Sequence, residues 1–150
     1  MPESFRTAME RRTFNLWPCY WGSGGRITYI ASDWREVRVE IPLSLRTRNY
    51  VGTIYGGSMY GAIDPLYMIM LIRNLGRDYD VWDKAASIQF KRPGRGTLHA
   101  RFLLTEEDLR TIRARLDTQR SLDRVYEVEL TDAAGKVHAL VEKTIYVSRR

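Results

Sequence analysis

The sequence predicts an α+β fold in which an antiparallel sheet wraps around one long, apolar central helix. One observation is the apolar run that follows the pair Gly56-Gly57 and continues to Ile72, which is typical of a buried helix. A second is that segments before and after this run alternate between apolar and polar side chains, as half-buried strands do. Because an apolar helix must bury its surface, a sheet that curves around it is the economical arrangement.

The chain is expected to begin with a short amphipathic helix in residues 4–16 that covers the sheet. Trp17-Pro18 should end this helix, because proline cannot continue one. The apolar side chains expected on its buried side are Phe5, Met9 and Leu16. The glycines within 22–25 favour a turn over a phosphate-binding loop, since a strand rather than a helix follows them.

The central helix carries one acid, Asp64, about two turns after its glycine entry. An ionised carboxylate among apolar side chains must be paired, solvated or kept neutral. Taken alone, a carboxylate bonded to the backbone or to a neighbouring tyrosine is the simpler interpretation. Pro65 lacks the N–H that would bond the carbonyl of Gly61, so we expect the helix to be kinked or weakened there.

Six strands and one more helix account for the remaining periodic segments. Three pairs of strands are expected to form hairpins, including one joined by the turn residues 93–95. Thr105 is a candidate N-cap, followed by acids in the first turn of a helical insertion at about 105–119. The expected strands are 27–31, 37–41, 84–92, 96–104, 125–131 and 137–148.

Composition and charge exclude several classes of protein. The 150 residues suffice for one domain, 1–150, and 44% of them are hydrophobic. The net charge is +6, but acids are interleaved with the basic residues, so nucleic acid is not expected as the main ligand. Cys19 is the only cysteine, which fits a reducing cytoplasm. Neither a membrane span nor a metal site is expected, because the apolar runs are short and His99 and His138 lack ligand spacing.

Residues 49–64 resemble the signature of hotdog-fold acyl-CoA thioesterases of the phenylacetyl-CoA (PaaI-like) type. The matching pattern is Asn49-x-x-Gly52-Thr53-x-x-Gly56-Gly57, followed by Asp64. The segment 90–96 resembles the next strand and turn of that family, and residues 27–147 follow its element order. The segments 15–18 and 81–87 are similar to an uncharacterised bacterial branch. The resemblance therefore implies a single hotdog domain.

The resemblance also implies a reaction. A small-molecule acyl thioester would bind across the interface of a homodimer, or of a dimer of dimers, near the N-terminus of the central helix. Asp64 would activate water as a general base or attack the carbonyl as a nucleophile. The Gly57 N–H would polarise the thioester oxygen, and Asn49 would orient the water or the carbonyl. No metal or cofactor is implied, since coenzyme A is part of the substrate.

Two further sets of residues are implied as substrate contacts. One set surrounds the glycine pair. The other set is basic and would bind the phosphates of coenzyme A. The alternative interpretation of the basic set is a solvated hairpin tip. The residues are Tyr55, Gly56 and Ser58, and Lys91, Arg92 and Arg95. Tyr55 replaces a histidine of many relatives, and Arg92 a serine or threonine of some. A hotdog protein that binds acyl groups or acyl-CoA without hydrolysis, and a basic nucleic-acid-binding or assembly protein, therefore remain as alternatives.

Overall fold

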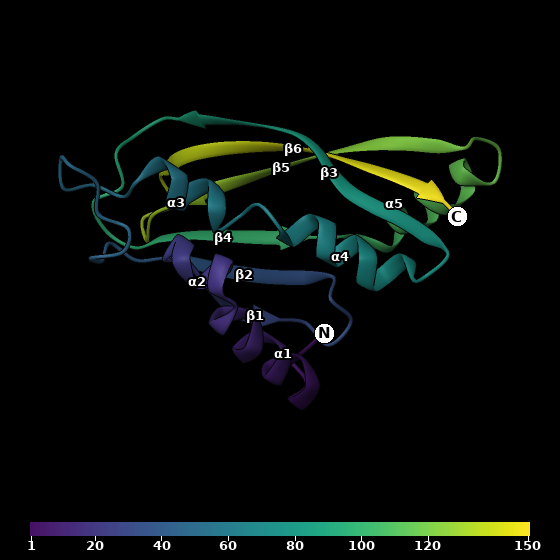
Figure 1. Ribbon diagram of the computed structural model, residues 1–150, viewed down its shortest axis with the longest axis horizontal. Helices are drawn as coiled ribbons and strands as arrows, with labels where there is room; N and C mark the ends of the chain where they lie inside the picture. The colour runs from purple at the N-terminus through teal and green to yellow at the C-terminus, as the bar shows by residue number, and fades with distance from the viewer.

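Six strands form one antiparallel sheet in the computed structural model, which describes residues 1–150. The strands are β1 (Arg26–Ile30), β2 (Glu36–Ile41), β3 (Tyr79–Phe90), β4 (Leu98–Leu103), β5 (Ser121–Thr131) and β6 (Val137–Arg149). Their order across the sheet is β1-β2-β4-β5-β6-β3. The sheet curves around the helices of the middle of the chain (Figure 1), which confirms the predicted α+β architecture.

The pairing of β3 differs from the expectation. The predicted hairpin between 84–92 and 96–104 is wrong, because β3 pairs with β6 alone while β4 pairs with β2 and β5. After β3 the backbone N–H groups of Lys91 and Arg92 donate to the carbonyl of His138, so the chain bends across the end of β6. The turn residues 93–95 thus follow the end of β3, but they do not join it to an adjacent strand of the sheet. As a result, β3 is a free edge of the sheet.

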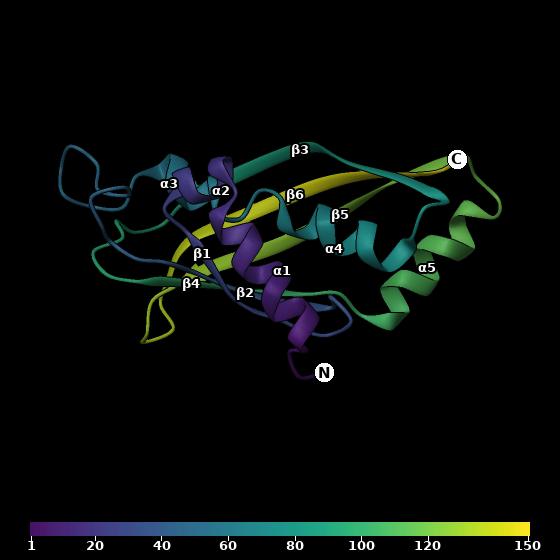
Figure 2. The same ribbon diagram turned by 60° about the horizontal axis from the view of Figure 1, so that its bottom comes forward.

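The central helix consists of two segments, α3 (Gly56–Gly61) and α4 (Leu66–Leu75), with a turn at residues 62–65 between them. This break confirms the weakening expected at Pro65, which has no N–H to donate. α4 packs Leu66, Met70 and Leu71 fully into the core. Both segments lie in the curve of the sheet (Figure 2). Asp64 consequently lies in the turn and not in the middle of a buried helix.

At the N-terminus, α1 (Phe5–Leu16) and α2 (Pro18–Ser23) lie beside the β1 end of the sheet (Figures 1 and 2). The predicted break at Trp17-Pro18 is confirmed, although Pro18 then starts α2, as proline can at a first helical position. The expectation that the apolar side chains of α1 form its buried side is wrong. Phe5, Met9 and Leu16 are 85%, 44% and 75% exposed.

Polar contacts explain why the apolar side of α1 stays uncovered. The Asn15 side chain donates to the carbonyl of Ile27 at 2.8 Å and accepts from its N–H at 2.7 Å. Glu10 accepts from the indole Nε1 of Trp34 at 2.8 Å. These bonds turn the polar side of α1 toward the sheet, so its apolar side chains face outward.

The predicted insertion contains α5 (Glu106–Leu116). Thr105 caps it, because its Oγ1 accepts from the N–H of Asp108 at 3.0 Å. Leu109, Ile112 and Leu116 are buried at helical spacing, as the sequence predicts. They join a continuous hydrophobic core that is built from the helices and the concave face of the sheet. None of the helices combines the length and the apolar character needed to cross a bilayer.

Candidate functional site

The carboxylate of Asp64 is anchored through one oxygen only. Its Oδ1 accepts hydrogen bonds from Tyr60 Oη and from Lys143 Nζ, both at 2.7 Å. Its Oδ2 has no hydrogen-bond partner within the protein, and 45% of the side chain is exposed. The turn before Pro65 thus presents one fixed carboxylate whose second oxygen faces outward.

Lys143 is the buried partner of this carboxylate. Its side chain is only 1% exposed, and Nζ also lies 3.0 Å from Asp83 Oδ1, an ionic contact without the direction of a hydrogen bond. Lys143 comes from β6 and Asp83 from β3, where the pairing shifts register between Asp83 and Ala85. A bulge of this kind re-aims a side chain. Three separate elements therefore meet at the α3–α4 turn.

The charges of this cluster determine the ionisation of Asp64. Burial opposes ionisation, but hydrogen bonds from Lys143 and Tyr60 outweigh it and hold the pKa of Asp64 below its ordinary value. Burial raises the pKa of Asp83, against the opposing effect of Lys143. Burial also disfavours the Lys143 cation, yet its hydrogen bonds to Asp64 and Tyr60 and its ionic contact with Asp83 raise its pKa overall. The environment therefore shifts the pKa values of the two carboxylates in opposite directions, and Asp64 is the more readily ionised.

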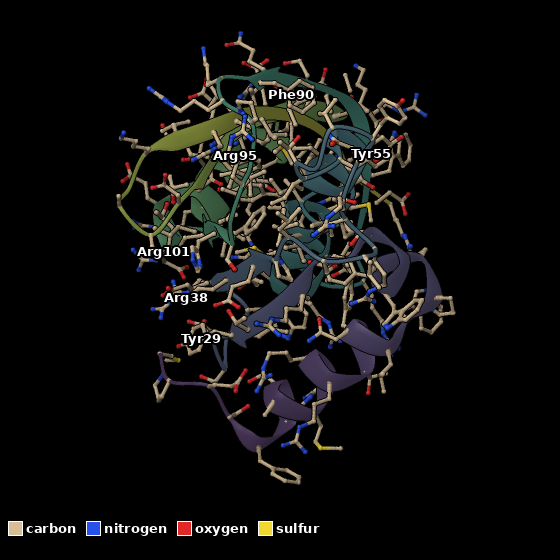
Figure 3. The ribbon with its side chains drawn as sticks, turned by 90° about the vertical axis from the view of Figure 1, so that its left-hand side faces the viewer. Tyr29, Arg38, Tyr55, Phe90, Arg95 and Arg101 are labelled. Atoms are coloured by element: carbon tan, nitrogen blue, oxygen red, sulfur yellow. The ribbon has the colours of Figure 1, made fainter.

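The N-terminus of α3 forms a second polar region. The N–H groups of Gly56 and Gly57 have no acceptor in the protein, as expected at a helix start. A Cβ at Gly57 would lie 2.3 Å from Tyr55 Cε1, and one at Gly56 would lie 2.9 Å from Phe90 Cζ. The glycines thus let two aromatic rings, 59% and 57% exposed, lie against the helix start. Tyr55, Phe90 and Arg95 face the same end of the molecule (Figure 3).

Asn49 organises the loop that leads into α3. Its Oδ1 accepts from the N–H groups of Val51 and Thr53 at 3.1 and 2.9 Å, and its Nδ2 donates to Thr53 Oγ1 at 2.9 Å. These are the contacts of a turn-forming asparagine. A role of Asn49 in orienting water or substrate stays a prediction. Ser58 is only 4% exposed on α3, and contact of its hydroxyl with substrate likewise stays a prediction.

The basic residues after β3 are exposed and close to the α3 entrance. Lys91 Nζ donates to Gln89 Oε1 at 2.9 Å, and Arg92 Nη1 donates to the carbonyl of Val137 at 2.7 Å. The same loop contacts the glycine motif, because Ile54 N–H donates to the carbonyl of Gly94 at 2.9 Å. The loop that carries Lys91, Arg92 and Arg95 therefore contacts the second polar region through Gly94, while the Arg92 side chain reaches the start of β6.

Within one subunit, Asp64 and Gly57 lie at opposite ends of α3. A helix rises about 1.5 Å per residue, so the six residues of α3 extend over roughly 9 Å. No hydrogen bond joins Asp64 to Asn49 or to the glycine pair. The single chain thus holds two separate sets of polar groups, one at each end of α3.

Sequence reasoning missed Lys143 and Asp83. A signal for Lys143 was present, because it occupies an inward position of the alternating strand, between the fully buried Val141 and Ile145. A charge at such a position needs a buried partner. No comparable signal points to Asp83, since the register shift that directs it exists only once β3 and β6 pair.

Comparisons with known proteins agree with this architecture. The family model described as "Domain of unknown function (DUF4442)" matches residues 6–147, and the chain belongs to this family. No curated protein matches the sequence.

Several solved structures share the fold. A Pseudomonas aeruginosa protein of unknown function, described as a probable thioesterase, is 20% identical with a TM-score of 0.83 over 100% of this chain and 99% of its own. A Chlorobaculum tepidum protein of unknown function has a TM-score of 0.74 at 15% sequence identity, over 97% of this chain and 95% of its own. A Haemophilus influenzae thioesterase has a TM-score of 0.69 at 14% sequence identity, over 98% of this chain and 93% of its own. These likenesses confirm the predicted hotdog fold.

Proposed function

We propose that the chain is a thioester hydrolase that acts on an acyl-CoA type of substrate with the carboxylate of Asp64. The observation that carries this is the asymmetry of that carboxylate. Lys143 and Tyr60 hold Oδ1, whereas Oδ2 is unbonded on a side chain that is 45% exposed. A fixed and ionised carboxylate with one free oxygen is what a general base or a nucleophile requires.

Two routes lead from this carboxylate to the same products. As a general base, Oδ2 takes a proton from water while the water oxygen attacks the thioester carbonyl, and the thiolate leaves and is then protonated. As a nucleophile, Oδ2 forms an acyl–carboxylate anhydride and expels the thiolate, and water then hydrolyses the anhydride. In both routes Lys143 positions Asp64 and keeps it ionised, while an N–H such as that of Gly57 polarises the carbonyl oxygen.

We propose a homodimer in which the thioester lies across the subunit interface. Supporting this, the outer side of β3 has no neighbouring strand, and such a free edge is available for pairing with another chain. Trp82 on this strand is 51% exposed. In the loop before α3, Leu45, Tyr50 and Val51 are 92%, 104% and 73% exposed. A partner that covered these groups would bring the ends of two α3 helices toward one substrate.

The phosphates of coenzyme A are proposed to contact Lys91, Arg92 and Arg95. The loop that carries them contacts the α3 entrance through Gly94. Their side chains are exposed and pair with no carboxylate of the chain, so their charges are free for an anion. The arginines on the outer face of the sheet differ, because Arg38 and Arg101 both pair with Glu36 at 2.8 Å. This pairing weighs against a basic stripe for nucleic acid.

A non-catalytic acyl-binding protein is the second candidate, and one observation favours it. The ion pair with Lys143 lowers the pKa of Asp64, and a carboxylate with a lower pKa is a weaker base. The protein would then hold an acyl group next to Asp64 without hydrolysing it.

A panel of acyl-CoA thioesters, assayed by release of free thiol, tests the proposal. We expect turnover by the wild type and a loss of about 10²- to 10⁴-fold in Asp64→Asn, the usual effect of removing a general base. Asn49→Ala should lower activity less, through its loop. Binding of acyl-CoA without thiol release would favour the second candidate, and hydrolysis by Asp64→Asn at the wild-type rate would show that the site assignment is wrong.

A further inference from the structure

An apolar groove of about 980 Å³ separates the N-terminal helices from the α3–α4 turn. One wall comes from α1 and α2, and the other from Pro65 and Ile69 of the central helix. Pockets of roughly 300–1,000 Å³ are the size that holds small organic ligands. The residues that α1, α2 and the link between them contribute include Phe5, Met9, Phe14, Trp17 and Cys19.

The groove contains the apolar side chains that the fold leaves uncovered. Phe5, Met9 and Trp17 are 85%, 44% and 61% exposed, although they line a concave surface. All 150 residues of the chain are described, and none of them fills this space. Any occupant of the groove therefore comes from outside these 150 residues.

The charges in the groove favour an uncharged occupant. Arg6 and Arg73 both contact Glu10, at 3.3 and 3.2 Å, and Arg73 also stacks on the Trp34 ring at 5.0 Å. The lining thus has two cations, Arg6 and Arg73, and two carboxylates, Glu10 and Asp64, so its formal charges cancel. No unpaired cation is present to hold an anionic ligand, whereas the apolar surface would bind a hydrocarbon chain.

The groove reaches the proposed reacting group. Asp64 and Gly61 line it on the side next to α2, where Tyr20 Oη donates to the carbonyl of Ala62 at 2.8 Å. The opposite end lies at Phe5 and Arg73. Because a helix rises about 1.5 Å per residue, the α1 residues that line the groove, from Phe5 to Phe14, extend over roughly 14 Å. This elongated shape fits an extended chain better than a compact ring.

We infer that this groove binds the acyl chain of the substrate, and that the chain is a medium- or long-chain fatty acyl group whose carbonyl lies at Asp64. The inference rests on the proposed function for the position of the carbonyl. It adds the substrate class and assigns a binding role to the N-terminal helices. A short acyl group would not reach the apolar wall formed by α1, so burial of that wall would add little to its binding free energy.

Cys19 permits a binding test that requires no catalysis. It is exposed, it lines the groove and it is the only thiol of the chain. Decanol is a suitable ligand because its uncharged head group is not repelled by Asp64, and butanol is its short control. At about ten times its Kd, decanol should slow the alkylation of Cys19 by iodoacetamide about tenfold, because only the unoccupied fraction reacts. Butanol at the same concentration should leave the rate unchanged.

Two matched substitutions on α1 locate the binding. Met9→Arg places a charge in the groove, whereas Leu16→Arg changes an exposed apolar residue of the same helix that lies outside it. Met9→Arg should abolish protection by decanol and lower kcat/KM for decanoyl-CoA about tenfold or more relative to butyryl-CoA, since a hydrocarbon chain packed in the groove would desolvate the new charge. Leu16→Arg should retain both properties.

The outcomes separate this inference from the proposed function. Protection of Cys19 that depends on Met9, in a protein that hydrolyses no thioester, would support the groove and remove the hydrolase. Hydrolysis that requires Asp64 but has the same chain-length preference in Met9→Arg would support the hydrolase and overturn the groove. Failure of decanol to slow alkylation overturns the groove, as does alkylation that slows with protein concentration alone, because a second copy would then cover it.

Discussion

The two ends of α3 hold their polar groups in different ways. At the N-terminal end the Gly56 and Gly57 N–H groups come from one local motif, and they are bordered by the exposed rings of Tyr55 and Phe90. At the C-terminal end Asp64 is fixed by Lys143, which comes from the opposite side of the core. A helix start with free N–H groups can thus be built from adjacent residues, whereas a carboxylate held by a buried lysine requires the tertiary fold.

Replacing Lys143 is expected to have the largest effect on stability. Lys143→Met leaves Asp64 and Asp83 without their shared cation, and breaking a buried pair costs about 3 kcal/mol of unfolding free energy, the lower end of the usual range because Asp64 can turn to water. Urea unfolding measures this loss. The matched control is Lys84→Met, which removes an exposed contact to Asp123 on the same sheet and should cost less than about 1 kcal/mol. Equal losses in the two variants would contradict the description of the Asp64 end as fixed.

Adding a methyl group at each end of α3 compares their rigidity. In Gly25→Ala the new Cβ would lie 2.4 Å from the Cβ of Ala62, which is fully buried in the turn before Asp64, and overpacking there should cost about 2 kcal/mol. In Gly57→Ala it would meet the ring of Tyr55, which is exposed and can move, so the loss should stay below about 1 kcal/mol. Thermal unfolding of both variants checks this order. The reverse order would show that the glycine end is the rigid one.

Removing the second anchor of Asp64 should have a smaller effect. Tyr60→Phe deletes one hydrogen bond to Oδ1 and keeps the ion pair with Lys143, so we expect a loss of about 1 kcal/mol in unfolding free energy. The pKa of Asp64 should rise, because one of the bonds that stabilise its ionised form is gone. Urea unfolding and a carboxyl titration by NMR measure the two quantities. An unchanged pKa would mean that Lys143 alone determines the ionisation.

Local patterns in the sequence predict most of the fold. The alternation of β2 and β6, the N-cap at Thr105 and the break at Pro65 all depend on neighbouring residues, and the structure confirms each of them. The partner of β3 could not be predicted in this way, because the turn residues at 93–95 look the same whether the next strand lies beside β3 or elsewhere.

The candidate site was predictable only in part. The glycine motif and Asp64 are visible in the sequence, but Lys143, which holds Asp64, lies 79 residues further along the chain. Asp83, which shares the Lys143 cation, comes from a different strand again. Similarly, the apolar residues of α1 indicate a buried surface, and only the polar contacts of Asn15 and Glu10 show that this surface stays open.

The pH dependence of kcat/KM for thioester hydrolysis tests whether an ionised Asp64 held by Lys143 is the reacting group. The pKa of Asp64 in the folded protein is lowered from the ordinary value of about 3.9. Its ionised form is therefore fully present at pH values above about 5, and it is lost only as the pH falls through the lowered pKa. We therefore predict a constant kcat/KM from about pH 8 down to pH 5, with the acid limb below the ordinary value. An acid limb centred above about pH 5, or one that is unchanged in the residual activity of Asp64→Asn, would contradict the account.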